Sequence, residues 1–239
     1  MFPVNGRLYI GIANELESSA CDENPGGVVS LGGATGAVLG TWWADRDHGN
    51  GGGVWTLPAF DVATNRLFVT TGTVADHVDP TTKPWQQAFV AIDAVSMETL
   101  DSFQTVPTPF SVNYEAGASP TLFDAADGRH LIAASNKNGY VYALNRNALA
   151  VGVVWTYQIS GAGQSPDFGE GTIVSAVGEV VSAVSHSSDN TGRIYVVEQT
   201  TGNVLYTFST AHRLFAQPTW ANGMLYVVDE GGTLFVLRP

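Results

Sequence analysis

The fold is decided by residues 120–146, which read PTLFDAADGRHLIAASNKNGYVYALNR. Two short apolar segments flank Asp127-Gly128, and a third apolar segment follows Asn138-Gly139. Asp-Gly and Asn-Gly pairs favour tight hairpin turns, because these residues tolerate the positive φ angles that such turns require. The stretch therefore predicts consecutive antiparallel strands, and residues 153–157 (VVWTY) supply one more strand after them.

The same order of strands and turns recurs along the chain. The third strand of each copy starts at residue 28, 89, 141, 194 or 234, so the copies lie 40 to 61 residues apart. Four antiparallel strands every roughly 40–50 residues are typical of a β-propeller. We therefore predict an all-β fold, a single β-propeller domain of four-stranded antiparallel blades. A two-layer β-sandwich is the alternative, but a sandwich does not require this recurrence. The approximate blades are residues 1–43, 55–107, 118–158, 170–209 and 214–239.

The last repeat raises the question of how the ring closes. It reaches Pro239 without a fourth strand. A propeller needs a closed ring, because an open one exposes blade faces and strand edges. Either a strand from the N-terminal end completes the last blade, or the chain is a fragment of a larger propeller. A chain that starts inside one repeat and stops inside another favours the second alternative.

Composition excludes several classes of protein. Hydrophobic residues make up 44% and charged residues 13% of the 239 residues, which is enough apolar material for a core. The net charge of −12 argues against nucleic acid as a partner, because phosphates repel an acidic surface. No apolar run approaches the roughly 20 residues that span a bilayer, and no signal peptide is visible. Cys21 is the single cysteine, so no internal disulfide forms.

Three segments carry more than generic blade features. They are residues 49–55 (GNGGGVW), 117–123 (GASPTLF) and 134–146 (ASNKNGYVYALNR). Together they resemble the dehydrogenases that depend on pyrroloquinoline quinone (PQQ), particularly the polyvinyl alcohol dehydrogenase-like branch. This resemblance implies a quinoprotein alcohol dehydrogenase-like propeller of PQQ-binding-like repeats, with PQQ and Ca²⁺ as cofactors.

The resemblance assigns cofactor-binding roles to four residues. Trp55 would carry the quinone ring on its indole face, and Gly52 and Gly53 would let the backbone approach a flat ligand. Lys137 matches the Lys or Arg that hydrogen-bonds a quinone oxygen, where an ammonium group stabilises developing negative charge. The alternatives are a core tryptophan that anchors a blade, glycines that serve a loop, and a solvated cation in a turn.

The resemblance also suggests metal and catalytic residues. Glu15 matches a glutamate that ligates Ca²⁺, although an exposed loop acid is the alternative. Thr73 stands where the family commonly has a second ligand, an asparagine, and a hydroxyl is a poorer ligand for calcium. Where relatives draw the catalytic base from a pair of acids, this chain has Asn113 and Glu115. Asn113 cannot accept a proton, so Glu115 is the candidate base.

These features lead to two functional hypotheses. The first is an oxidoreductase that oxidises a small-molecule or polymeric alcohol with PQQ and Ca²⁺. Electrons would pass to a separate acceptor such as a cytochrome c, because the chain has no Cys-x-x-Cys-His haem motif. The second is a non-catalytic scaffold or binding module, like BamB, that has lost the quinone site, as the changes at Thr73 and Asn113 would suggest. Members of the family that this sequence resembles are mostly exported, so we expect a periplasmic or extracellular protein with no membrane span.

Overall fold

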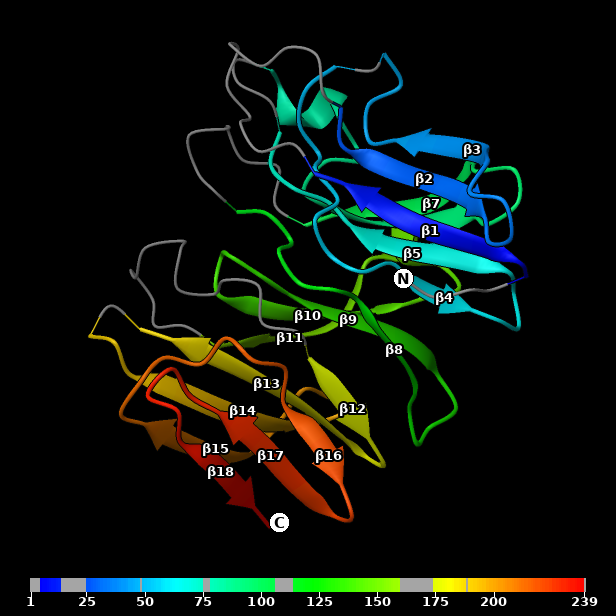
Figure 1. The fold of residues 1–239 in the computed structure, drawn as a ribbon. Helices are drawn as coiled ribbons and strands as arrows, with labels where there is room; N and C mark the ends of the chain where they lie inside the picture. The colour runs from blue at the N-terminus through cyan, green and yellow to red at the C-terminus, as the bar shows by residue number, and fades with distance from the viewer. Residues whose placement is uncertain are drawn as a thin grey trace. The chain divides into compact units, whose positions relative to one another are not determined.

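The chain folds as a series of antiparallel sheets (Figure 1). The computed structural model describes residues 5–13, 25–47, 49–74, 78–105, 114–159, 174–187 and 189–238. These residues form five sheets, and in every sheet the strands follow one another in chain order. Three sheets have four described strands and two have three. Such sequential antiparallel sheets are propeller blades, so the prediction of an all-β propeller is confirmed.

Residues 1–116 form one compact unit, which contains two of the sheets. Its first sheet consists of β1 (Arg7–Ile12), β2 (Gly27–Gly32) and β3 (Val38–Trp43). Its second sheet consists of β4 (Ala59–Asp61), β5 (Arg66–Thr70), β6 (Ala88–Asp93) and β7 (Thr99–Gln104). A short 3₁₀ helix, η2 (Pro80–Thr82), lies in the connection between β5 and β6. Among the described residues of the whole chain, no helix is long and apolar enough to cross a membrane.

Residues 117–239 form the second unit, which contains the other three sheets. The first consists of β8 (Thr121–Asp124), β9 (His130–Asn136), β10 (Tyr140–Asn145) and β11 (Val153–Gln158), with η3 (Leu149–Val151) before β11. The second consists of β12 (Ser175–Val177), β13 (Val180–His186), β14 (Gly192–Glu198) and β15 (Val204–Thr210). The third consists of β16 (Thr219–Ala221), β17 (Met224–Val228) and β18 (Leu234–Leu237).

Two of the Asn-Gly pairs form the tight turns that the sequence predicts. Asn222 and Gly223 join β16 to β17 with φ angles of 52° and 73°, so both residues adopt the left-handed conformation. Asn5 and Gly6 have the same conformation before β1, with φ angles of 52° and 72°. Two consecutive positive φ angles define the type I′ turn, whose twist matches that of the strands it connects.

The middle strands of the sheets are buried on both faces. All of Ala88–Ile92 in β6 and Leu131–Asn136 in β9 are buried, and β6 is apolar in every position but its last. Blades packed face to face bury both sides of their middle strands, which replaces the simple alternation of polar and apolar residues. In the first unit Val28, Leu67 and Val90 share one core cluster. Burying each such side chain stabilises the fold by about 1.5–3 kcal/mol.

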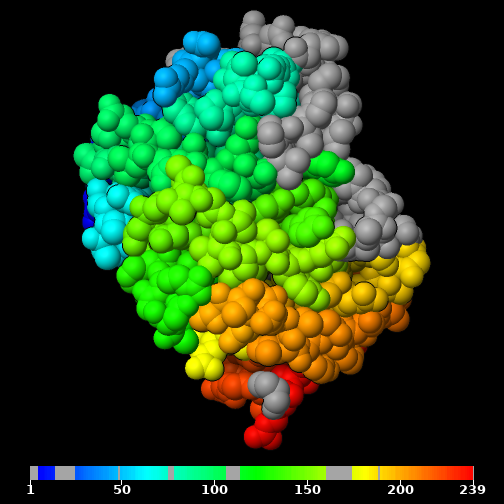
Figure 2. Space-filling view, turned by 180° about the vertical axis from the view of Figure 1, so that it is seen from behind, coloured from blue at the N-terminus to red at the C-terminus, as the bar shows by residue number. Residues whose placement is uncertain are grey.

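The outermost strands are exposed on one side. In β15, Val204, Leu205 and Tyr206 are exposed, and the orange side chains of this region lie on the face of the second unit seen in Figure 2. A register shift recurs where the outer strand pairs with its neighbour, in β2–β3, β6–β7, β10–β11 and β14–β15. A bulge of this kind bends the strand and increases its twist, so the repeats share a local distortion as well as a strand order.

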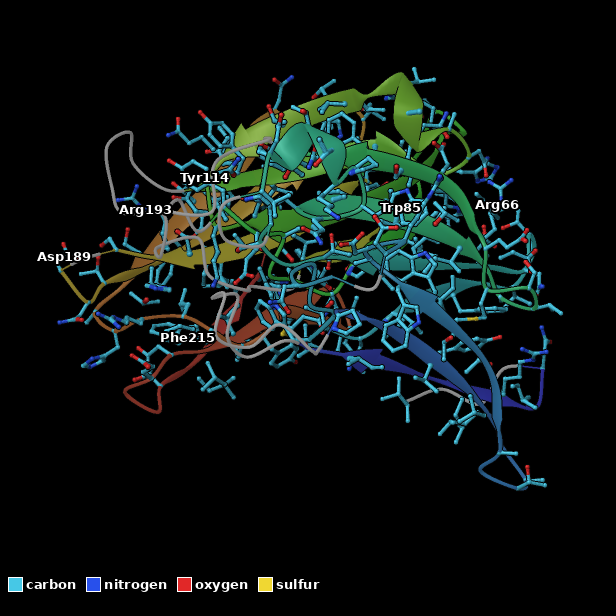
Figure 3. All side chains as sticks on the ribbon, turned by 90° about the horizontal axis from the view of Figure 1, so that it is seen from above. Arg66, Trp85, Tyr114, Asp189, Arg193 and Phe215 are labelled. Atoms are coloured by element: carbon cyan, nitrogen blue, oxygen red, sulfur yellow. The ribbon has the colours of Figure 1, made fainter. Side chains whose placement is uncertain are left out.

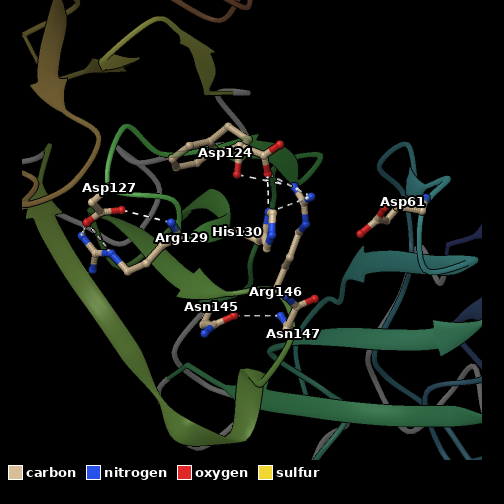
Figure 4. Close-up of polar contacts among 10 residues, drawn as sticks. Asp61, Asp124, Asp127, Arg129, His130, Asn145, Arg146 and Asn147 are labelled. Atoms are coloured by element: carbon tan, nitrogen blue, oxygen red, sulfur yellow. Dashed lines mark hydrogen bonds and ion pairs between the residues drawn. The ribbon is translucent and has the colours of Figure 1, made fainter.

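One polar network joins three strands at the same end of their sheet (Figure 4). Asp124 Oδ1 lies 2.7 Å from His130 Nδ1 and 3.0 Å from Arg146 Nη2. Arg146 Nη1 also donates to the carbonyl oxygen of Phe123 at 3.4 Å. The hydrogen bond with His130, together with the positive charge of Arg146, holds the pKa of Asp124 below its ordinary value.

Asp124→Asn is expected to lower the melting temperature slightly at neutral pH and to have no effect in acid. A carboxylate whose pKa is lowered by folding contributes stability above its unfolded-state pKa and loses that contribution as the pH falls through its folded-state pKa. The effect is small because the Asp124 side chain is 64% exposed. Thermal unfolding of both proteins across acidic and neutral pH tests this. A difference in melting temperature that stays constant at every pH would contradict it.

Candidate functional site

The glycine-rich segment 51–53 pairs with the segment that follows β5. The Gly52 N–H donates to the Thr73 carbonyl oxygen at 2.9 Å, and the Gly72 N–H donates to the Gly53 carbonyl oxygen at 2.8 Å. Gly51 and Val74 form an isolated antiparallel bridge beside them. The first unit thus brings together Gly52, Gly53 and Thr73, which are three of the residues predicted for the site.

Gly52 is required by the packing of the chain itself. Its φ angle is 67°, and a Cβ atom there would lie 2.5 Å from Ala44 Cβ and 2.9 Å from Gln86 Cγ. No other residue fits without displacing these neighbours. The Gln86 side chain donates from Nε2 to the Asn50 carbonyl oxygen at 2.8 Å. Its Oε1 is buried and has no hydrogen-bond partner within the described part of the chain.

Glu115 joins this group through its side chain. The Thr73 hydroxyl donates to Glu115 Oε2 over a long 3.4 Å, and both residues are buried, with 1% and 7% of their surface exposed. A buried carboxylate beside a hydroxyl offers the hard oxygen atoms that Ca²⁺ prefers and also a group that can accept a proton. The described residues contain no cluster of three or more His, Cys, Asp or Glu side chains that could hold a metal ion.

Two predicted positions cannot be placed. Glu15, the predicted calcium ligand, and Asn113, the position that departs from the family pattern, both lie outside the described residues. Their roles therefore stay predictions.

Trp55 follows the glycine segment, and its indole is not part of the core. The residue is 46% exposed, whereas the preceding Val54 is buried and donates its N–H to the Ile12 carbonyl oxygen at 2.9 Å. Val54 fixes the backbone, while Trp55 is about half exposed. An accessible indole next to closely packed backbone is suited to stacking against a flat ligand.

Lys137 belongs to the second unit, in the turn between β9 and β10. Asn136 Oδ1 accepts the N–H of Asn138 at 2.8 Å, and Asn138 Nδ2 donates to the Tyr142 hydroxyl at 2.6 Å. Gly139 closes the turn by donating its N–H to the Asn136 carbonyl oxygen at 3.0 Å. These bonds hold the backbone of Lys137, which is half-exposed. Lys137 follows the second strand of its sheet, and Thr73 follows the second strand of its own sheet, so the two residues occupy similar positions in their blades.

Sequence reasoning missed the residues that hold the β5–β6 connection in place. Gln104, the last residue of β7, points its side-chain Nε2 at the carbonyl oxygens of Pro80, Lys83 and Gln86, at 3.0, 3.2 and 3.1 Å. The donor and its acceptors are 18 to 24 residues apart, and neither segment carries a recognisable motif. Gln86 is part of this connection, so Gln104 holds the backbone of Gln86, while the Gln86 side chain is bound to Asn50.

The chain is similar in sequence to one curated relative, the polyvinylalcohol dehydrogenase of Sphingopyxis sp. (strain 113P3). The two are 23% identical over 256 aligned positions, which cover 87% of this chain and 38% of the relative. The chain thus spans well under half the length of that protein. No protein-family model matches it.

Solved structures of dehydrogenases share the fold. The quinohemoprotein alcohol dehydrogenase ADHIIG of Pseudomonas putida HK5 superposes with a TM-score of 0.77 at 14% identity, over 98% of this chain and 49% of that one. A europium-containing methanol dehydrogenase superposes with a TM-score of 0.73 at 13% identity, over 99% of this chain and 60% of that one. BamB from Moraxella catarrhalis superposes with a TM-score of 0.57 at 13% identity, over 96% of this chain and 63% of that one. At such identities the likeness establishes the fold, which is the propeller of the quinoprotein dehydrogenases.

Proposed function

We propose that this chain is part of a quinoprotein that oxidises an alcohol, in the polyvinyl alcohol dehydrogenase-like branch, using PQQ and Ca²⁺. The electrons pass to a separate acceptor such as a cytochrome c, and the protein works in the periplasm or outside the cell. The sequence similarity to a polyvinylalcohol dehydrogenase over 87% of the chain supports this function. The five predicted blades form one propeller domain in this proposal.

The observation that carries the proposal is the grouping of predicted residues in the first unit. Gly52 and Gly53 hydrogen-bond the segment containing Thr73, and the Thr73 hydroxyl contacts the carboxylate of Glu115. The resemblance assigns all of these residues to the quinone, metal or catalytic site from separate parts of the sequence. These residues lie far apart in the sequence, so their proximity in the first unit supports the assignment.

The donor atoms present fit the two cofactors. Thr73 supplies a hydroxyl oxygen for a hard cation, to which Glu15 would add a carboxylate, and the Thr73 hydroxyl also contacts Glu115, the proposed base. The buried Gln86 Oε1, without a hydrogen-bond partner in the described residues, is a further amide oxygen beside Gly52. The exposed indole of Trp55 offers a stacking face for a flat quinone. When bound, PQQ supplies a two-electron acceptor for the alcohol carbon.

The remaining chemistry belongs to the side chains of this chain. Glu115 accepts the hydroxyl proton of the alcohol, which leaves the oxygen able to form a carbonyl group as the carbon is oxidised. Thr73 holds Glu115 Oε2 by its hydrogen bond and so orients the carboxylate. The resemblance assigns to Lys137, in the second unit, an ammonium group that would stabilise negative charge on a quinone oxygen. Trp55 orients the ring plane.

Lys137→Ala is expected to weaken PQQ binding about tenfold or more, because a hydrogen bond to a charged group contributes roughly 1.5–3 kcal/mol. PQQ is titrated into the protein in the presence of Ca²⁺, and the absorbance of bound quinone reports the dissociation constant. Lys137→Arg keeps a cation and should retain most of the affinity. Arg193→Ala removes an exposed cation from β14 and serves as the control. An unchanged dissociation constant for Lys137→Ala would show that the residue lies outside the site.

A second candidate function is a non-catalytic scaffold, which the shared fold with BamB favours. Thr73 and Asn113 replace residues that the quinoprotein pattern prefers at the metal and base positions. Absence of PQQ binding at micromolar concentration, together with absence of dye-linked alcohol oxidation, would favour this scaffold over the enzyme.

A further inference from the structure

A pocket lined by tryptophans lies in the first unit. Its volume is about 350 Å³, within the usual range for small-ligand sites. Trp42 and Trp43 reach it from the end of β3, and Trp85 reaches it from the β5–β6 connection. Figure 3 labels Trp85. The pocket continues into a second hollow of about 280 Å³, which shares Asp45, Arg46 and Trp85 with it.

The aromatic walls are fixed by the fold. Trp42 is 3% exposed, and its Nε1 donates to the Thr99 hydroxyl at 2.8 Å. The rings of Trp42 and Trp85 contact each other, with centroids 6.1 Å apart and planes at 42°. Trp43 packs closely over Gly27, where a Cβ atom would lie 2.6 Å from Trp43 Cε3. A preformed wall of this kind binds a ligand without first ordering its own side chains.

The charged groups around the two hollows nearly balance, with Asp45, Asp47 and Glu98 acidic and Arg46 and Lys83 basic. Lys83 Nζ forms an ion pair with Asp45 Oδ2 at 2.6 Å, and the Asp45 side chain is 5% exposed. Arg46 lies over the Trp85 ring at 4.7 Å, so the cation that an indole face attracts is already supplied by the chain. Glu98 adds an exposed carboxylate opposite in sign to Arg46. This balance disfavours strongly charged ligands and suits a neutral one.

A neutral chain with alternating hydrocarbon and hydroxyl groups matches this lining. Its hydrocarbon groups can pack on the exposed parts of the Trp43 and Trp85 side chains, while its hydroxyls can donate to Glu98 and accept from Arg46. Residues of the pocket and of the candidate site lie in the same two segments between strands. Trp85 and Thr73 lie between β5 and β6, and Asp45 and Gly52 lie between β3 and β4.

We propose that the pocket of Trp42, Trp43 and Trp85 binds an open, hydroxylated carbon chain, as a remote subsite for a polymeric alcohol such as polyvinyl alcohol. The identification of the bound polymer as the substrate rests on the proposed function, whereas the binding of the polymer does not. A segment held here keeps the polymer attached to the enzyme while another of its hydroxyl groups is oxidised.

Binding to the protein without PQQ tests the subsite independently of catalysis. Polyvinyl alcohol of defined length is titrated while tryptophan fluorescence and heat are recorded, with maltohexaose as the comparison ligand. We expect saturable binding of polyvinyl alcohol that Trp85→Ala weakens about fivefold. Trp85→Phe should retain part of the affinity, and the exposed Glu98→Gln should weaken binding without affecting folding. Tyr206→Ala removes an exposed aromatic residue from β15 and should change nothing.

The holoprotein adds a second readout. Trp85→Ala should raise KM for polyvinyl alcohol and leave kcat/KM for 2-propanol unchanged. Polymer binding without any alcohol oxidation would support the subsite and overturn the proposed enzyme function. Alcohol oxidation with no saturable binding of the polymer would overturn the subsite alone. Binding of maltohexaose in preference to polyvinyl alcohol would overturn the assignment of an open chain.

Discussion

Glu115→Gln is expected to reduce dye-linked alcohol oxidation by about 10²–10⁴-fold, the usual contribution of a general base. The amide has nearly the same shape as the carboxylate and can still accept the hydrogen bond from Thr73. It cannot accept a proton from the alcohol, so the loss should appear in kcat. The measurement is steady-state oxidation of a secondary alcohol by the protein reconstituted with PQQ and Ca²⁺.

The controls separate catalysis from binding and folding. Glu115→Gln should keep the melting temperature close to that of the wild type and still bind PQQ. If calcium affinity falls with activity, Glu115 is a metal ligand and a calcium titration of both proteins will show it. Full activity in Glu115→Gln would mean that the base lies elsewhere in the chain.

Trp155→Ala is expected to destabilise the second unit by about 3–5 kcal/mol, the usual cost of deleting a large buried aromatic side chain. Trp155 is 6% exposed and lies on β11, where its Nε1 donates to the Gln199 carbonyl oxygen at 2.7 Å. Its ring also covers Gly202, where a Cβ atom would lie 2.8 Å from the ring. The indole therefore joins the sheet of β8–β11 to that of β12–β15, and its loss leaves a cavity between them.

Urea unfolding measures this effect. Val153→Ala provides the matched control, because Val153 lies on the same strand and is 40% exposed, so its loss should change stability little. The free energy of unfolding of Trp155→Phe should lie between those of Trp155→Ala and Val153→Ala, because the variant keeps the ring contacts and loses the hydrogen bond. A Trp155→Ala protein as stable as Val153→Ala would show that the two sheets do not depend on this contact.

The strands were predictable because their signals are local. Asn222-Gly223 forms its turn from two adjacent residues, and each blade repeats the strand order of residues 120–146. The tryptophan pocket was not predictable in the same way. Its walls come from β3 and the β5–β6 connection, and only tertiary packing brings Trp42 and Trp85 together. The contact between Thr73 and Glu115 spans 42 residues, so no spacing rule could have identified it.

The side-chain amide of Gln104 has a consequence for motion. Because the side-chain amide at the end of β7 contacts carbonyl oxygens of Pro80, Lys83 and Gln86, loss of pairing at the end of this strand would also loosen that stretch of the chain. Fraying at the end of β7 and loosening of residues 80–86, which include Trp85, would then be coupled. The rate at which a long polymer enters or leaves would be governed by the breathing of a strand that the polymer need not touch.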